Sequence, residues 1–236
     1  MDTGRAVPGP AREASQFDLM RERRFAPFFW TQFLGAANDN VFKNALVIFV
    51  AFQAAGMTSM DPNTLVNLAG AVFIAPFMLL SAMGGQLADK FEKSRLIRAI
   101  KLFEIAIMVV GLAGFWMRDL ATLFAALALM GVHSTLFGPV KYAILPQHLK
   151  PEELVGGNGL VEMGTFVAIL AGTIAGGLVV GTGPNGPLWA GALAIAIAVA
   201  GWFASRAIPE TPAVDPNLAL AWNPFTETWR NLVFAS

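Results

Sequence analysis

Six long apolar runs dominate this chain, and they constrain its fold more than any other feature. A helix that crosses a bilayer needs roughly 20 mostly apolar residues. The composition agrees with membrane insertion, because 56% of the 236 residues are hydrophobic and 14% are charged, whereas a soluble domain carries about 25% charged residues. The sequence therefore predicts an all-α membrane protein with spans at about residues 26–53, 64–87, 96–117, 120–145, 157–181 and 186–207.

The basic residues lie on alternate sides of these runs, which predicts the topology. The three loops on one side hold only Arg118, and the other side holds nearly all the remaining lysines and arginines. Cytoplasmic segments of membrane proteins carry this excess of Lys and Arg, so both ends of the chain are expected in the cytoplasm. The residues that set this pattern are Arg5, Arg12, Arg21, Arg23, Arg24, Lys90, Lys93, Arg95, Arg98, Lys101, Lys150, Arg206 and Arg230.

The segments outside the runs differ in character from the bundle. Residues 1–19 are predicted to be a disordered cytoplasmic N-terminus, and residues 20–208 to be the six-helix transmembrane bundle. Residues 209–236 are expected to be a cytoplasmic linker in which NPFTETWRNLVFAS (223–236) forms an amphipathic segment, because its apolar residues fall at helical spacing. That pattern stops without a closing feature, so we expect a longer parent protein.

Polar residues interrupt the first apolar run near its centre. The stretch QFLGAANDNVFKNALVIFVAF carries Asp39 and Lys43, four residues apart, among Asn38, Asn40 and Asn44. A charge at the bilayer centre costs at least ~2.5–3.5 kcal/mol, so the two charges either form a local ion pair or line a polar cavity. We favour the cavity, with Asp39 as a proton, ion or headgroup contact and with Lys43 and Asn40 beside it, because a helix without a functional demand would carry Leu or Val here.

Other polar residues in the runs also have two interpretations. His133 could change charge near neutral pH, or it could be a packed, neutral, hydrogen-bonded side chain among small neighbours. Lys141 could extend its ammonium to the membrane surface, or it could pair with Glu162 as a structural lock or a gate. Glu104 lies in the cytoplasmic half of the third run.

Motifs for catalysis are absent from the sequence. No glycine-rich phosphate loop follows a strand, and no cluster of metal ligands appears. Glu153 follows His148 by five residues, so the two do not form the His-x4-Asp pair of glycerolipid acyltransferases. Cysteine is absent, which excludes disulfides and thiolate metal sites, and no basic patch with interleaved aromatics indicates nucleic acid. We therefore expect no enzymatic activity, cofactor, metal or nucleic-acid partner for these residues.

The loop between the second and third runs carries a recognisable motif. GGQLADKFEKSR (84–95) resembles the helix 2–3 loop of the major facilitator superfamily, with matches at Gly85, Leu87, Ala88, Asp89, Lys93 and Arg95. Glu92 stands where the family usually has a second glycine, and Ser94 replaces a basic residue. The resemblance implies the six-helix N-terminal half of a twelve-helix transporter, built as a 3+3 inverted repeat. It also implies that Gly85, Asp89, Lys93 and Arg95 form a gating motif.

Three further segments resemble one branch of that superfamily. FLGAANDNVFKNAL, FGPVKYAILPQHL and NGLVEMGTFVAILAGTIAGG together are similar to the lysophospholipid transporter family, in the form fused to an acyltransferase and an acyl-carrier-protein synthetase. The resemblance implies functional positions for Asp39, Lys141 and Glu162. It also implies lysophospholipid flipping across the bacterial inner membrane for reacylation, with the bilayer, a C-terminal six-helix half and a fused or associated acyltransferase as partners.

Two other functions fit the residues. One is a proton- or ion-coupled facilitator for a small soluble substrate, with Asp39 as the proton site. The other is a membrane anchor for a downstream acyltransferase that transports nothing itself.

Overall fold

Six long helices account for most of the chain in the computed structural model, which describes residues 15–53 and 57–220. The predicted amphipathic segment at 223–236 lies outside the described residues, as do residues 1–14 of the predicted N-terminal tail. The helices agree closely with the expected spans: α1 (Ala26–Gln53), α2 (Pro62–Lys90), α3 (Lys93–Met117), α4 (Leu120–His148), α5 (Leu154–Val180) and α6 (Gly186–Ser205). Two short 3-10 helices, η1 (Gln16–Arg21) and η2 (Pro151–Glu153), precede α1 and α5.

Side chains at the loops determine where several helices begin. The carboxylates of Asp61, Glu92 and Asp119 accept hydrogen bonds from backbone N–H groups in the first turns of α2, α3 and α4. Such caps satisfy donors that have no partner inside the helix. Arg118 ends α3 in the left-handed conformation (φ 52°), so the chain reverses sharply between α3 and α4.

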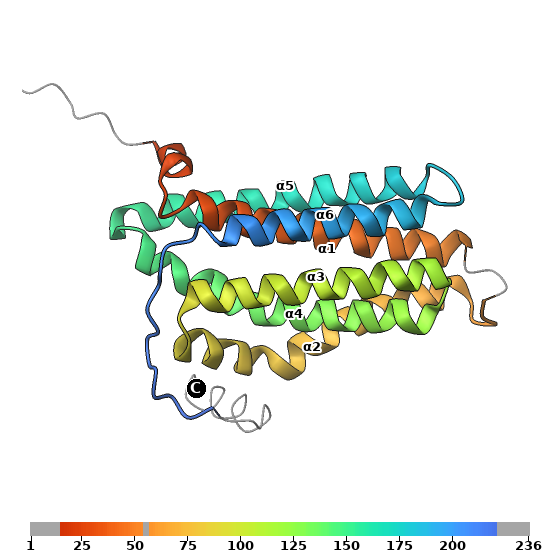
Figure 1. Cartoon of the computed structure of the whole chain (residues 1–236), viewed down its shortest axis with the longest axis horizontal. Helices are drawn as coiled ribbons and strands as arrows, with labels where there is room; N and C mark the ends of the chain where they lie inside the picture. The colour runs from red at the N-terminus through yellow and green to blue at the C-terminus, as the bar shows by residue number, and fades with distance from the viewer. Residues whose placement is uncertain (1–14, 54–56, 221–236) are drawn as a thin grey trace, which may run out of the picture.

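Four of the helices in the described part of the chain are long and apolar enough to cross a membrane by length and composition. They are α2, α4, α6 and the stretch Pro151–Val180 that contains α5. The other two helices, α1 and α3, are of similar length and run alongside them (Figure 1), but they carry charged and amide side chains within their length. The arrangement is that of a multi-pass membrane protein.

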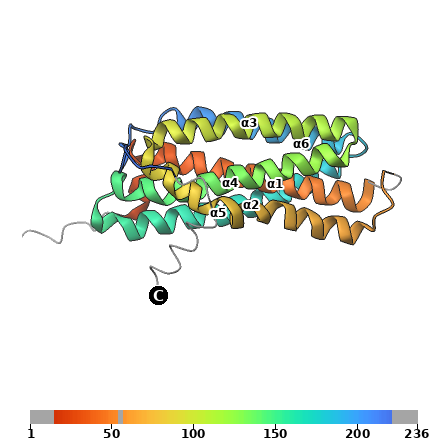
Figure 2. The same ribbon diagram turned by 90° about the horizontal axis from the view of Figure 1, so that it is seen from below.

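The helices form two layers of three (Figures 1 and 2). In one layer α1 packs against α5 and α6, and in the other α4 packs against α2 and α3, while α3 and α6 also meet each other. Exchanging α1, α2 and α3 for α4, α5 and α6 leaves this set of neighbours unchanged. The packing therefore has the internal symmetry of a 3+3 repeat, with α1 and α4 in equivalent positions.

One end of the bundle collects four segments that are distant in sequence. Figure 1 shows η1, the α2–α3 loop, the α4–α5 connection and the chain after α6 at the same end. We call this the basic end, because it carries Arg24, Lys90, Lys93 and Lys150 among other basic residues. The segment after α6, residues 207–218, crosses this end and is called the strap below.

Glycines allow α1 and α5 to approach closely. A Cβ atom on Gly172 would lie 2.4 Å from the carbonyl oxygen of Ala37, and one on Gly176 would lie 2.7 Å from that of Val41. The GTIAGGLVVG stretch of α5 thus serves helix packing, through this pair of glycines. Gly177, next to Gly176, has only an ordinary contact 3.7 Å away.

This difference gives a matched pair of variants. Gly172→Ala should destabilise the bundle by about 1–3 kcal/mol, because the added methyl group must push two backbones apart. Gly177→Ala should leave stability nearly unchanged, since its methyl group has room. Thermal unfolding of the purified protein in one detergent measures both. Equal melting temperatures for the two variants would show that the α1–α5 contact is not as close as described.

Candidate functional site

A polar layer divides the interior of the bundle into two apolar parts. Buried apolar side chains form two separate clusters, one on either side of this layer. Neither cluster includes a buried residue from positions 30–40 of α1, 101–106 of α3 or 131–139 of α4, which lie at the same level of the bundle. Buried polar side chains fill these positions: Thr31, Gln32, Asn38, Asn40, Lys101, Glu104, His133 and Thr135. Buried polar groups are costly without partners, so their contacts define what the layer does.

Glu104 of α3 is the centre of the layer. Its side chain is 0% exposed and forms an ion pair with Lys101, one turn earlier on α3. Asn38 of α1 donates a 2.7 Å hydrogen bond to Oε1 of Glu104, and Nε2 of His133 on α4 lies 3.3 Å from Oε2. One carboxylate thus joins α1, α3 and α4 at mid-bundle.

Asp39 opens onto a cavity beside this cluster. The cavity has a volume of about 270 Å³, and both charged and aromatic residues line it: Gln32, Gly35, Ala36, Asp39, Phe77, Lys101, His133, Ser134, Phe137, Gly138, Lys141 and Thr165. Oδ2 of Asp39 accepts a 2.8 Å hydrogen bond from the Ser134 hydroxyl. Among the described residues, no cation lies within ion-pair distance of Asp39, so its charge is available to a ligand.

The other end of the cavity holds a cation that already has a partner. Nζ of Lys141 lies 3.3 Å from Oε1 of Glu162 and donates a 3.0 Å hydrogen bond to the Thr165 hydroxyl. Tyr142 also donates to Glu162, at 2.7 Å. The Glu162 side chain is 43% exposed, so this pair spans from the cavity to the surface. The structure thus brings Lys141 and Glu162 together and directs Lys141 into the same cavity as Asp39.

The side chains of Lys43 and Asn40 have partners other than Asp39. Nζ of Lys43 sits 4.4 Å from the centre of the Phe73 ring and lines a separate groove between α1, α2 and α4. No ion pair joins Lys43 to Asp39 in the described part of the chain. Asn40 donates to the carbonyl oxygen of Ala36 within its own helix. The local ion pair that the spacing allowed is therefore not formed.

The sequence analysis did not assign Lys101 and Glu104 to this layer. Lys101 appeared to belong to the basic boundary of the α2–α3 loop, and Glu104 had no assigned partner. In the structure both are buried, with Lys101 1% exposed, between glycines of α1 and α6: a Cβ atom on Gly35 or Gly201 would lie 3.2 or 2.9 Å from its Nζ. The available signal was their spacing of three residues inside an apolar run, which is that of a helical ion pair.

The loop motif at the basic end packs against α4 and binds the strap. A Cβ atom on Gly85 would meet nothing within 4 Å, whereas one on the preceding Gly84 would lie 2.7 Å from the Thr135 carbonyl oxygen of α4. Asp89 exposes its side chain, and its carbonyl oxygen accepts from Val214 and Asp215 of the strap. Close packing thus falls on Gly84, and the strap binds the Asp89 backbone.

The strap is attached mainly through Thr211, which is 1% exposed. Its N–H donates to Oε1 of Glu92 at 2.7 Å, and its carbonyl oxygen accepts from the N–H of Lys93 at 2.9 Å. Its hydroxyl lies 2.6 Å from Nε2 of His148. Nζ of Lys93 donates to the Pro212 carbonyl oxygen, while Arg95 is exposed near Glu92 and Glu210. Lys93 is therefore fixed by the strap, and Arg95 is free to meet solvent.

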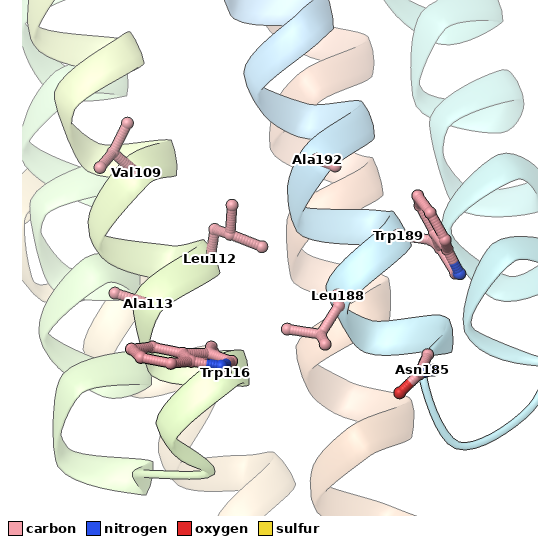
Figure 3. Close-up of a pocket in the computed structure, with 8 residues that line it drawn as sticks. All are labelled: Val109, Leu112, Ala113, Trp116, Asn185, Leu188, Trp189 and Ala192. Atoms are coloured by element: carbon pink, nitrogen blue, oxygen red, sulfur yellow. The ribbon is translucent and has the colours of Figure 1, made fainter.

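A larger groove between α3 and α6 has a different character. It has a volume of about 550 Å³, and none of its eight lining residues is charged. Figure 3 shows Leu112 and Trp116 of α3 on one side, Leu188 of α6 on the other and the Asn185 amide at the edge. Trp116 and Trp189 are 74% and 63% exposed, as expected of tryptophans at a membrane–water interface. This groove lacks the charges that would bind a headgroup.

The cavity assignment predicts a difference between neighbouring residues of α4. Ser134 lines the cavity, and Thr135 is 2% exposed and bonded to the carbonyl oxygen of Gly131 in its own helix. In this cysteine-free chain, Ser134→Cys should react with a water-soluble maleimide, and Thr135→Cys should not. Mass spectrometry of labelled membranes measures both. Equal labelling of the two positions would contradict the cavity.

The strap should release at low pH. Burial alone would raise the pKa of Glu92, but hydrogen bonds from the N–H of Thr211 and from Ser94 and Arg95 hold this pKa below its usual value. An unfolded Glu has a pKa of about 4.3, so the ionised carboxylate stabilises the strap above that pH. The stabilisation is lost as the pH falls through the lower folded-state pKa.

Spin labels at Val214→Cys and Leu102→Cys report this release as a broadened distance distribution. It should appear in the otherwise unchanged protein only when the pH falls below about 4.3, the pKa of an unfolded Glu, and already at pH 7 in Glu92→Gln. Glu210→Gln, which removes an exposed carboxylate of the same segment, is the control and should behave as the parent does. A distribution that ignores both pH and Glu92→Gln would show that this carboxylate does not hold the strap.

Comparisons with known proteins agree with this architecture. The family model described as Major Facilitator Superfamily matches residues 27–235. Lysophospholipid transporter LplT of Serratia proteamaculans (strain 568) is 32% identical over 193 residues, which cover 82% of this chain and 44% of that protein. The LplT of Salmonella heidelberg (strain SL476) is 31% identical over 208 residues, which cover 85% and 48%. The chain thus spans about half the length of the curated relatives it matches.

Solved structures show the same fold at lower identity. A crystal structure of a peptide transporter, POT, in complex with sulfate matches with a TM-score of 0.65 and 23% identity, covering 97% of this chain and 45% of that one. A bacterial homologue of the iron transporter ferroportin, in an outward-facing state, matches with a TM-score of 0.58 and 17% identity, covering 81% and 52%. At these identities the likeness establishes the fold alone.

Proposed function

This chain belongs to the major facilitator superfamily, and from that premise we propose that its six helices form the N-terminal half of a lysophospholipid transporter. The transporter flips a lysophospholipid from the outer to the inner leaflet of the bacterial inner membrane, where the lipid is reacylated. A second six-helix half completes it, and an acyltransferase, fused or associated, consumes its product. The relatives named lysophospholipid transporter, which are about twice as long as this chain, support the substrate class and the second half.

One observation carries the proposal: the mid-bundle cavity presents a carboxylate without a cationic partner. Asp39 is bonded only through the Ser134 hydroxyl in the described structure, and the cation at the other end of the cavity, Lys141, is shared with Glu162. An ethanolamine headgroup carries an ammonium and a phosphate, which suit these two ends. Phe77 and Phe137 in the cavity wall offer an apolar surface to the start of the acyl chain.

The proposed orientation of the chain in the membrane rests on the distribution of its basic residues. We place the basic end in the cytoplasm, because Lys and Arg concentrate on the cytoplasmic side of membrane proteins. Residues 1–19 are then a cytoplasmic tail, residues 20–208 the membrane bundle, and residues 209–236 a cytoplasmic linker. The strap at the start of that linker is already bonded to the α2–α3 loop.

The loop motif serves as a gate in this proposal. Gly85, Asp89 and Arg95 have side-chain positions open to a second half of the protein, since Gly85 has no neighbour within 4 Å of an added Cβ and Asp89 and Arg95 are exposed. Lys93, held by the strap, fixes the loop on which they lie. The alternatives, a facilitator for a soluble substrate and a non-transporting anchor, predict no lysolipid uptake.

Uptake of lysolipids tests the charge of Asp39. Asp39→Asn in the full-length protein should lower uptake of lysophosphatidylethanolamine by spheroplasts roughly tenfold or more, because a hydrogen bond to a charged group contributes about 1.5–3 kcal/mol and 1.4 kcal/mol is tenfold. Asp39→Glu should retain part of the activity. Uptake of lysophosphatidylglycerol, which has no ammonium, should change little.

The separate positions of Asp39 and Lys43 supply the control. Since no ion pair joins them, Lys43→Met should not restore uptake to Asp39→Asn. Full rescue by the double variant at matched membrane levels would mean that Asp39 acts only as half of a buried pair. Absence of lysolipid uptake by the unaltered protein would contradict the proposed function itself.

A further inference from the structure

Lys43 differs from the other interior lysines in the described part of the chain, because it has no carboxylate partner there. Three lysines lie inside the helices rather than at their ends: Lys43, Lys101 and Lys141. The second and the third are each paired with a glutamate. The Lys43 ammonium instead lies 4.4 Å from the centre of the Phe73 ring. A cation–π contact offsets only part of the cost of a charge within a bilayer, so Lys43 still lacks a counter-charge.

The groove that Lys43 lines is otherwise apolar. It has a volume of about 270 Å³, lies between α1, α2 and α4, and is lined, among the described residues, by Lys43, Leu46, Val47, Val66, Ala69, Gly70, Phe73, Ile74 and Leu127. We call it the outer groove. Lys43 is its α1 residue nearest to the polar layer, and the other lining residues of α1 lie farther outward. A single cation at the inner end of an apolar groove suits a molecule with an acidic head and an apolar tail.

The outer groove lies next to the mid-bundle cavity, on the side away from the basic end. Lys43 follows Asp39 by four residues on α1, which is about 6 Å along a helix, and Phe73 precedes Phe77 by four residues on α2. In each pair the first-named residue lines the groove and the second lines the cavity. The centres of the Phe73 and Phe77 rings are 5.7 Å apart, so these two rings form a boundary between the groove and the cavity.

The other hollows among the described residues do not combine these features. The larger groove between α3 and α6 offers apolar surface to an acyl chain, but none of its lining residues is charged (Figure 3). The mid-bundle cavity offers no unpaired lysine, because Lys101 and Lys141, which line it, each have a glutamate partner. Charge complementarity therefore favours the outer groove for an anionic lipid.

We propose that the outer groove is an entry site for a lysophospholipid that arrives from the outer leaflet. Lys43 binds the phosphate, and the acyl chain lies along the apolar wall of the groove. Because the phosphate is then about one helical turn from Asp39, the headgroup reaches the cavity by passing the Phe73–Phe77 pair while the chain remains in the groove. The site deepens the proposed function and rests on it for the identity of the lipid.

The charge of Lys43 is tested with a lipid that carries a phosphate and no ammonium. Lys43→Met in the full-length protein should weaken binding of lysophosphatidylglycerol roughly tenfold, as expected for loss of a hydrogen bond to a charged group, and Lys43→Arg should retain most of the affinity. Lys150→Met, which removes an exposed lysine at the basic end, is the control and should bind as the parent does. Native mass spectrometry in one detergent measures the bound lipid.

A lipid without the phosphate separates the charge from the apolar surface. Monoacylglycerol has an acyl chain and no charge, so its weaker binding should be the same in the parent and in Lys43→Met. Lys43→Met should also keep the melting temperature of the parent, because no carboxylate among the described residues loses a partner.

Gly70 of α2 tests the position of the acyl chain. It lines the outer groove, and a Cβ atom added to it would meet nothing within 4 Å, so Gly70→Leu should occupy the groove without disturbing helix packing. This variant should weaken binding of long-chain lysophosphatidylglycerol several-fold and affect a short-chain form less. Gly159→Leu, at an equally open position of α5 outside the groove, is the control and should bind both forms as the parent does.

The outcomes separate this site from the proposed function. Unchanged binding of lysophosphatidylglycerol in Lys43→Met overturns the site, and a lowered melting temperature in that variant would then assign Lys43 to a carboxylate of the second half. Unchanged binding of the long-chain lipid in Gly70→Leu also overturns it. Either result leaves the proposed function intact if the unaltered protein takes up lysophosphatidylethanolamine. If the unaltered protein neither binds nor takes up a lysolipid, both proposals are wrong.

Discussion

The pairing of Glu104 with groups from three helices is the interaction on which the centre of this bundle depends. A carboxylate in the interior of a membrane protein is costly to insert, and one at 0% exposure has no access to water. The contacts of this carboxylate with Lys101, Asn38 and His133 offset that cost. The same contacts fix α1 and α4 relative to α3, and α1 and α4 are the helices that carry Asp39 and its partner Ser134.

Glycines make this arrangement possible in both layers of the bundle. In one layer, Gly172 and Gly176 bring α5 onto the backbone of α1, and in the other, Gly84 and Gly131 bring α2 and α4 together, with added Cβ atoms 2.4–2.7 Å from backbone oxygens. Helices in lipid gain stability from such close packing, because burial of apolar surface offers little advantage there. The two equivalent contacts hold α1 and α4 on either side of the cavity.

The sequence predicted the bundle well and the site in part, for different physical reasons. Helix lengths and loop positions follow from apolar runs and caps, which are local, so the expected spans agree with α1 to α6. Asp39 and Lys141 stood out as charges in apolar runs, and both line the cavity. Lys101 was placed at the wrong depth because its burial depends on gaps left by Gly35 and Gly201, which lie 66 and 100 residues away in sequence. Likewise, spacing alone allowed Asp39 and Lys43 to pair, and only the position of Phe73 on α2 shows why Lys43 points elsewhere.

The buried polar groups at mid-bundle have fewer hydrogen-bond partners than those at the basic end. At the basic end, Arg24 forms two short hydrogen bonds with Glu153, and Thr211 connects Glu92 with His148. At mid-bundle, Oδ1 of Asp39, Oδ1 of Asn38 and Nδ1 of His133 are buried without partners in the described structure. Each such atom costs about 1–3 kcal/mol, and apolar side chains of similar size would avoid that cost. Proteins depart from full satisfaction mainly at functional sites, so the place where this bundle accepts the cost is also the place where a charged ligand would recover it.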